Sequence, residues 1–94
     1  GNDVLAVGAL LEAKRLGLRV PEDVSITGFD DIEIAEIVSP SLTTVHVPHR
    51  EMGRGAARLL LALRSGETSV ASRELEATVK WRESLGPVAH VEAR

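Results

Sequence analysis

Residues 24–31 read Val-Ser-Ile-Thr-Gly-Phe-Asp-Asp, a short apolar and β-branched run that ends in two carboxylates. Runs of this kind are typical of strands buried on both faces of a parallel sheet between layers of helices. Gly28 is expected to let a neighbouring backbone approach this strand closely. Ligands of open parallel sheets bind just beyond the carboxyl ends of the strands. Asp30 lies at that position, so it is the first candidate for a ligand contact.

Helical and extended patterns alternate on either side of this stretch. The spacing of apolar residues predicts helices over 4–16 and 48–64, a short helical turn over 32–37, and extended segments over 42–47 and 75–81. Asn2 and Asp3 are interpreted as capping residues of the first helix, and Asp31 as the cap of the short turn. Together these patterns predict an α/β fold.

Composition limits the classes of protein to which the chain can belong. The 94 residues suffice for one domain at most, and a net charge of −3 gives no general attraction to nucleic acid. Cysteine is absent, which excludes disulfides and thiolate metal sites. No apolar run approaches the roughly 20 residues that cross a membrane, and no catalytic or cofactor motif is recognisable. The sequence therefore predicts a cytoplasmic protein that is not an enzyme and needs no cofactor or metal.

Three blocks of sequence carry a more specific signal. They are Gly1-Asn2-Asp3-Val4, the run from Leu18 to Asp31, and Ser39-Pro40-Ser41-Leu42-Thr43-Thr44-Val45. In this order and spacing they resemble the carboxyl-terminal third of the LacI/GalR family of bacterial transcription regulators, from Asn2 to about Pro87. The resemblance implies part of an effector-binding core with a periplasmic-binding-protein-like type I fold, a three-layer α/β/α arrangement with a parallel sheet. The chain lacks an initiator Met, and we expect a piece of such a regulator without its DNA-binding domain.

The resemblance also implies a division of the chain. The family core has two subdomains, and its chain crosses from one to the other. Residues 1–42 would belong to the C-terminal subdomain, 43–47 to a crossover hinge and 48–85 to the N-terminal subdomain. Residues 86–94 have little apolar content and are expected to form a mobile tail. The chain would therefore carry parts of both subdomains.

Four residues are candidate contacts for a small-molecule effector, a sugar or related metabolite. A carboxylate accepts hydrogen bonds from two neighbouring hydroxyls at once, although the position of Asp30 alone fits a turn or capping residue equally well. The family places an effector contact directly after a Gly-Phe or Gly-Tyr pair, which implies this role for Asp30 beside Phe29. Asn2 matches a family asparagine of the effector site and can also cap the helix. Val47 stands where many members have Gln, so the ligand would be less polar there or would be contacted from elsewhere.

The first helix is expected to present a second apolar face, because it has too many apolar residues for one buried stripe. The resemblance implies a homodimer contact there, and homodimer interfaces are richer in apolar surface than transient ones. The residues that match family dimer positions are Val7, Leu11, Ile37, Val38 and Pro40. Operator DNA would be bound only through the missing N-terminal domain, and no membrane partner is expected.

Other polar patterns are interpreted as structural. His46 and His49 straddle a strand and the start of a helix, so their convergence on one metal ion is not expected. Arg50, Arg54 and Arg58 form a spaced stripe, which indicates a solvated helix face rather than a phosphate groove.

Two alternative functions stay open. One is a sugar-binding protein of a transport system, which would carry an export signal ahead of these residues. The other is an α/β enzyme that uses Asp30 and Asp31 on a metal, which would need further carboxylates on neighbouring strands. A helix-turn-helix ahead of the chain would favour the regulator.

Overall fold

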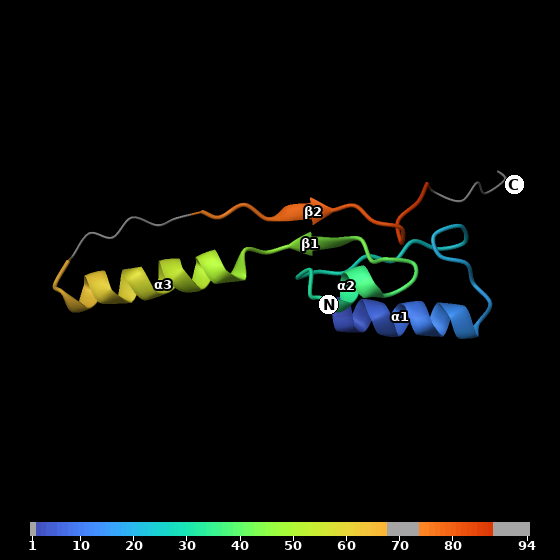
Figure 1. The fold of residues 1–94 in the computed structure, drawn as a ribbon, viewed down its shortest axis with the longest axis horizontal. Helices are drawn as coiled ribbons and strands as arrows, with labels where there is room; N and C mark the ends of the chain where they lie inside the picture. Colours follow the sequence, from blue (N-terminus) through green and yellow to red (C-terminus); the bar gives the residue numbers. More distant parts are fainter. Residues whose placement is uncertain (1, 68–73, 88–94) are drawn as a thin grey trace, which may run out of the picture. The chain divides into compact units, whose positions relative to one another are not determined.

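The computed structural model describes residues 2–67 and 74–87. Its elements, drawn in Figure 1, are helix α1 (Asp3–Arg15), helix α2 (Ile34–Ile37), strand β1 (Thr44–His46), helix α3 (His49–Arg64) and strand β2 (Thr78–Lys80). The chain forms two compact units: unit 1 comprises Gly1–His46 together with Thr78–Arg94, and unit 2 comprises Val47–Ala77. The helices agree closely with the predicted ranges, whereas the strands are shorter. The subdomain boundaries inferred from the sequence stay a prediction.

Helix α1 is capped at both ends. The Asn2 Oδ1 accepts hydrogen bonds from the backbone amides two and three residues further on, at 3.0 and 3.3 Å. These bonds satisfy amides that the first turn of a helix leaves unpaired. At the other end Gly17 has a φ of 77°, and Leu18 N donates to Ala13 O at 2.9 Å. A glycine in this left-handed conformation is a common way for a helix to end.

The core of unit 1 is small and lies against one face of α1. Its buried hydrophobic residues are Ala6, Leu10, Ala35 and Leu42, with the partly buried Val20, Ile26 and Val38 packed against them. The buried positions of α1 recur every three or four residues, as expected for one helix face. Helix α1 therefore contacts α2 through a narrow stripe of mostly small side chains.

Strands β1 and β2 pair in antiparallel orientation and lie side by side in Figure 1. Parallel pairing is present as two isolated bridges, one between Thr27 and Thr43 and the other between Asp30 and His46. Within the described part of the chain, the segment over 27–30 thus lies parallel to the residues around β1, and β2 pairs antiparallel with β1.

The prediction of a doubly buried strand over residues 24–29 is wrong. Val24 and Phe29 are exposed, and the segment makes isolated bridges in place of a continuous ladder. Its Ile26 amide donates to Ser84 O, and its Gly28 amide donates to Thr43 O, just before β1. Only two isolated bridges, at Thr27 and at Asp30, connect this segment to the residues around β1, so no regular strand forms here.

Ser84 joins three segments of unit 1. Its backbone amide donates to Ser41 O at 2.9 Å, and its carbonyl accepts from Ile26 N at 3.0 Å. Its hydroxyl is fully buried, donates to Ile26 O and accepts from Thr43 N at 2.9 Å. The residues that follow β2 are therefore held by side-chain hydrogen bonds, and the strand predicted over 75–81 is confined to β2.

The mobile tail predicted over 86–94 lies mostly outside the described residues. Gly86, which is described, is held: its amide donates to Ser25 Oγ at 3.0 Å, and that hydroxyl donates to Gly86 O at 3.3 Å. The first residue of the predicted tail is thus attached to unit 1.

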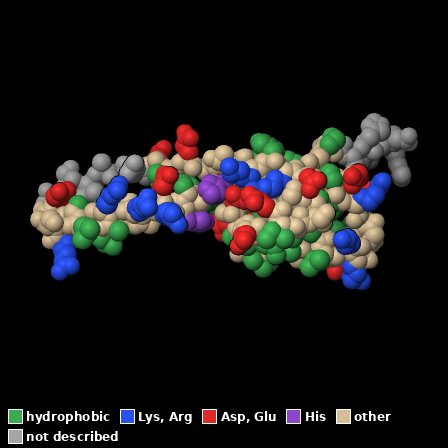
Figure 2. Space-filling model, in the orientation of Figure 1, with side chains coloured by type: hydrophobic (Ala, Val, Ile, Leu, Met, Phe, Trp, Pro, Cys, Tyr) green, Lys and Arg blue, Asp and Glu red, His purple; other side chains and the backbone are tan. Residues whose placement is uncertain are grey.

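Unit 2 contains the amphipathic helix α3. Figure 2 shows hydrophobic side chains along one edge of this helix and basic side chains along another. None of its residues is buried, and Arg50, Arg54 and Arg58 are exposed, in agreement with a solvated arginine stripe. No helix in the described ranges is long and apolar enough to cross a membrane.

Candidate functional site

The start of α1 meets the turn that follows Phe29. Asp3 N donates to Phe29 O at 3.1 Å, and Asp30 N donates to Val45 O at 2.9 Å. Asn2 directly precedes α1, so the first of these bonds brings it beside the turn. The structure therefore brings together three of the four predicted effector contacts, namely Asn2, Phe29 and Asp30.

The four predicted contacts differ in exposure. Phe29 is 46% exposed, Asn2 is exposed, and Asp30 is half-buried. The Asn2 Oδ1 already serves the helix cap, so its amide nitrogen is the group that could donate to a ligand. Val47 is half-buried and begins unit 2, immediately after β1.

Asp30 and Asp31 both adopt left-handed backbone conformations, with φ of 107° and 56°. Such conformations cost a non-glycine residue about 1 to 3 kcal/mol each and persist only where the surroundings hold them. Aspartate tolerates them better than most residues because its short side chain hydrogen-bonds locally. Strained turns of this kind cluster at ligand clamps, and this one carries the predicted effector carboxylate.

Asp31 does not cap a helix, contrary to the prediction. Helix α2 starts at Ile34 after Glu33, which makes no side-chain cap. The Asp31 carboxylate instead accepts from Arg82 Nη2 through Oδ1 at 2.8 Å and contacts His46 Nδ1 through Oδ2 at 2.9 Å. The prediction failed because the deciding partner lies 51 residues further along the chain.

The surroundings of Asp31 act on its pKa in opposite directions. Burial raises the pKa, but the hydrogen bonds and positive charge supplied by Arg82 and His46 outweigh burial and lower it below the usual aspartate value. Asp31 is therefore ionised at neutral pH. Its two oxygens act as acceptors that hold the turn on both sides.

Arg82 is the centre of this polar cluster. Its Nη1 donates to Leu42 O at 3.0 Å, while Nη2 donates to Asp31 and, at 3.3 Å, to Glu36 Oε1. The side chains of Arg82 and Asp31 are only 14% and 12% exposed. Figure 2 shows the acidic and basic groups gathered over β1 and β2. The guanidinium thus connects the turn, the segment just before β1, and α2.

The assignment of Asp3 to helix capping is also wrong. Its carboxylate is completely buried and accepts hydrogen bonds from Ile32 N at 2.8 Å and Thr44 Oγ1 at 2.7 Å. A Cβ at Gly28 would overlap with the Asp3 carboxylate. Gly28 therefore admits a side chain rather than the neighbouring backbone that the sequence led us to expect. This carboxylate holds the far side of the turn against α1 and β1.

The predicted dimer residues are only partly at the surface. Leu11 is 65% and Ile37 is 70% exposed, whereas Val7, Val38 and Pro40 are half-buried. Val38 also packs against the core. Figure 2 shows hydrophobic side chains gathered over α2 and the beginning of α1. An apolar surface is present there, but Val38, one of the predicted dimer residues, packs partly into the core.

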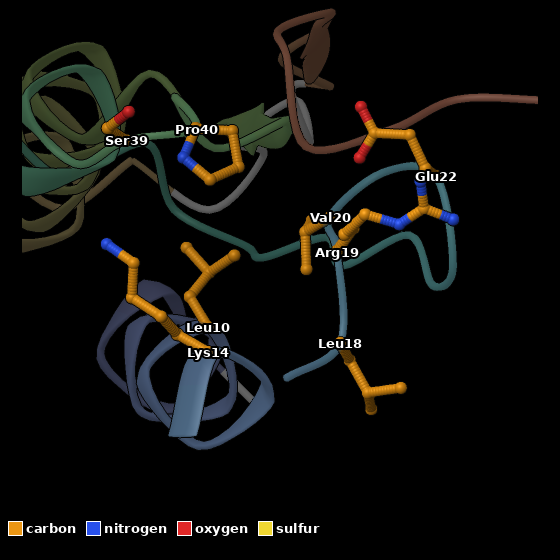
Figure 3. Close-up of a pocket in the computed structure, with 8 residues that line it drawn as sticks. All are labelled: Leu10, Lys14, Leu18, Arg19, Val20, Glu22, Ser39 and Pro40. Carbon is orange, nitrogen blue, oxygen red and sulfur yellow. The ribbon is translucent and has the colours of Figure 1, made fainter. Parts of the chain in front are cut away.

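Pro40 also lines an open groove of about 370 Å³. In Figure 3, Leu10 and Lys14 point from α1 toward Ser39 and Pro40, whereas Leu18 points away from them. The remaining lining residues are Arg19, Val20 and Glu22. The groove lies along the second half of α1, away from the turn at its start.

The described residues contain no group of three or more histidine, cysteine, aspartate or glutamate side chains that could hold a metal ion. His46 contacts Asp31, and His49 belongs to unit 2. Asp31 is paired with Arg82, so the proposal that Asp30 and Asp31 share a metal gains no support.

Sequence reasoning missed Arg82 and Ser84. Both lie directly after the alternating run that contains β2, where polar residues are ordinarily read as loop. A basic residue at the end of a strand, with the carboxylates of Asp30 and Asp31 elsewhere in the chain, was the available signal. It was too weak to identify the partner.

Comparison with known proteins places these elements in a family. The model for the periplasmic binding protein-like domain matches residues 1–85. The chain belongs to the periplasmic binding protein-like domain family. A curated relative, the HTH-type transcriptional repressor CytR of Escherichia coli strain K12, is 52% identical over 66 residues. The match covers 70% of this chain and 19% of CytR, so the chain spans a small part of that relative.

Solved structures of this family agree with the same relationship. The lac repressor dimer bound to operator and the anti-inducer ONPF has a TM-score of 0.83 and 32% identity, over 90% of this chain and 30% of that one. A LacI family regulator from Enterococcus faecium with bound ribose has a TM-score of 0.83 and 35% identity, over 93% and 33%. The resemblance to LacI/GalR regulators and the partial periplasmic-binding-protein-like fold are confirmed.

Proposed function

We propose that the chain is the carboxyl-terminal part of the effector-binding core of a LacI-type transcription regulator. In this proposal it binds a sugar or related metabolite and contributes to a homodimer. The intact regulator acts in the cytoplasm and binds operator DNA through a separate domain. The chain performs no catalysis.

The observation that carries the proposal is the left-handed turn at Asp30, fixed against the start of α1. The turn presents a half-buried carboxylate next to the exposed ring of Phe29 and the cap residue Asn2. A carboxylate matches two neighbouring hydroxyls, and an aromatic ring beside it covers the apolar face of a sugar. This combination favours a polyol ligand.

Family relationships support the same ligand class. The Enterococcus faecium regulator holds ribose, and the lac repressor structure holds an anti-inducer together with operator DNA. A sugar effector and a DNA-binding partner are therefore proposed for the intact form of this protein. The subdomain division at 43–47, with Val47 at the effector, is part of the proposal.

Asp30→Ala in the intact regulator tests the proposal. Titration calorimetry against a panel of pentoses, hexoses and disaccharides that includes ribose first identifies a sugar that binds. Loss of a hydrogen bond to a charged group costs about 1.5 to 3 kcal/mol, so the variant should bind that sugar roughly ten- to a hundredfold more weakly. Operator binding without sugar should be retained, because Asp30 is outside the core.

Glu33→Ala is the matched control. Glu33 is an exposed carboxylate three residues from Asp30 and makes no cap bond to α2. Its removal should leave sugar affinity unchanged. Equal affinity of Asp30→Ala and wild type would reject Asp30 as an effector contact.

A sugar-binding protein of a transport system remains the second candidate, because the matched family model is described as a periplasmic binding protein-like domain. Electrophoretic mobility shift of the intact protein with DNA from its own promoter region separates the two. Sugar-sensitive binding supports the regulator, and sugar binding without any DNA binding supports transport.

A further inference from the structure

The ion pair between Arg82 and Asp31 is unlike the pairs that Arg15 and Arg19 make. Arg15 with Glu12 and Arg19 with Asp23 are local pairs on the surface, three and four residues apart. Arg82 and Asp31 are 51 residues apart and mostly buried. Burying such a pair costs desolvation energy that its attraction does not reliably return. We therefore infer that this pair serves to fix the position of the residues around it.

The residues that this pair holds in position form the left-handed turn at Asp30 and Asp31. The Asp31 carboxylate is held by Arg82 on one oxygen and His46 on the other, and the Asp31 amide donates to Thr44 Oγ1 at 3.3 Å. Asp31 shares a planar peptide with Asp30. Holding Asp31 therefore restricts the direction in which the Asp30 side chain leaves the backbone.

We propose that Arg82 is a positioning residue for the effector site, which holds the Asp31 carboxylate and thereby aims the neighbouring Asp30 carboxylate at the hydroxyls of a sugar. Arg82 itself acts without touching the ligand, because both of its terminal nitrogens donate to protein acceptors. The inference rests on the proposed function for the identity of the ligand. Arg82 holds the turn through contacts that do not depend on the ligand.

Arginine suits this task better than lysine. One planar guanidinium reaches Leu42 O through Nη1 and Asp31 Oδ1 through Nη2, so its orientation is fixed by two acceptors. A lysine ammonium carries the same charge but lacks the rigid fork. Arg82→Lys should therefore keep the charge and lose much of the positioning.

The first experiment reads the turn without any ligand. Amide hydrogen exchange in the intact regulator should be faster at Asp30 and Asp31 in Arg82→Gln, while exchange within α1 stays as in wild type. Arg19→Gln is the matched control, since it removes the exposed pair with Asp23. It should leave exchange at the turn unchanged.

The second experiment is a double-mutant cycle read by calorimetry with the panel sugar that wild type binds, ribose being the first probe. Arg82→Gln and Arg82→Lys should each weaken binding roughly tenfold. In the Asp30→Ala background, Arg82→Gln should add less than about twofold, because the side chain that it aims is gone. A merely structural role would give independent, multiplicative losses.

The outcomes separate the two proposals. If Asp30→Ala binds sugar normally, the proposed effector contact is rejected, and the exchange experiment still decides whether Arg82 holds the turn. If Asp30→Ala is impaired but both Arg82 variants bind normally, or the losses multiply, positioning is overturned. Asp31→Asn, which keeps the shape of the side chain, replaces Arg82→Gln if that variant does not fold. It should show the same non-additivity with Asp30→Ala.

Discussion

Gly28 is the residue at which the smallest change should have the largest effect on folding. A methyl group there would overlap with the Asp3 carboxylate, which is buried and already bonded to Ile32 N and Thr44 Oγ1. Gly28→Ala should therefore destabilise the intact protein by about 2 kcal/mol or more, seen as a lower midpoint of urea unfolding.

Gly8→Ala is the control for this substitution. Gly8 lies within α1 with nothing near its position for a Cβ, so alanine should stabilise the helix by up to about 1 kcal/mol. Equal unfolding midpoints for Gly28→Ala and wild type would show that the Asp3 carboxylate can move aside. Opposite shifts of the two variants are expected.

Asp31 should make the stability of the folded protein depend on pH. Its pKa in the folded protein is lowered, chiefly because Arg82 and His46 outweigh the effect of burial. A lowered folded pKa gives stability that is fully present above the unfolded value of about 3.9 and is lost as pH falls through the folded pKa. Stability decreases with falling pH because the unfolded chain, with the higher pKa, binds the proton more tightly.

The stability lost in Asp31→Asn should accordingly be larger at about pH 5 than at about pH 3, measured by urea unfolding. Asp23→Asn, in which the other carboxylate of an Arg–Asp pair is neutralised at the surface, should show a much smaller difference. A stability difference for Asp31→Asn that does not change between these pH values would contradict the role of its charge.

At the scale of elements, the segment after β2 depends on one hydroxyl. Ser84 Oγ is buried and connects Ile26 O with Thr43 N, so removing it leaves a buried donor and a partly buried acceptor without this partner. Ser84→Ala should cost about 1 to 3 kcal/mol of unfolding free energy. Ser65→Ala removes an exposed hydroxyl that also donates to a backbone carbonyl, and it should cost little. Similar losses for both would reject the bridging role.

At the scale of the whole molecule, the apolar surface over α1 and α2 is proposed to hold two copies together. Leu11→Glu in the intact regulator should weaken dimerisation at least tenfold, because a charge would be buried in the interface, and should reduce operator binding with it. Analytical ultracentrifugation measures the dimer directly.

Ala9→Glu is the matched control on the same helix. At about 100° per residue, Ala9 points roughly 160° away from Leu11 and is also exposed. It should leave the dimer intact. Dimerisation of Leu11→Glu at wild-type strength would reject this surface as the interface.

Local features of the chain were predictable because neighbouring residues decide them. The cap of Asn2, the left-handed end at Gly17 and the limits of α1 and α3 follow from propensities within a few positions. The family resemblance also came from short contiguous blocks, and the relatives confirm it. The backbone bond from Asp3 N to Phe29 O brings two of those blocks together, while the role of Phe29 and Asp30 as effector contacts stays a prediction.

The roles of Asp3, Asp31, Arg82 and Ser84 were decided only by tertiary structure. A carboxylate after a turn and one at the start of a helix are capping residues by local rules, and the partners that override those rules lie 29 to 51 residues away. The partners of residues 24–29 also lie far along the chain, since Ile26 N donates to Ser84 O and Gly28 N donates to Thr43 O. Sequence specifies which polar groups must be satisfied, whereas packing selects their partners, because a buried charge or hydroxyl binds whichever group the fold brings within reach.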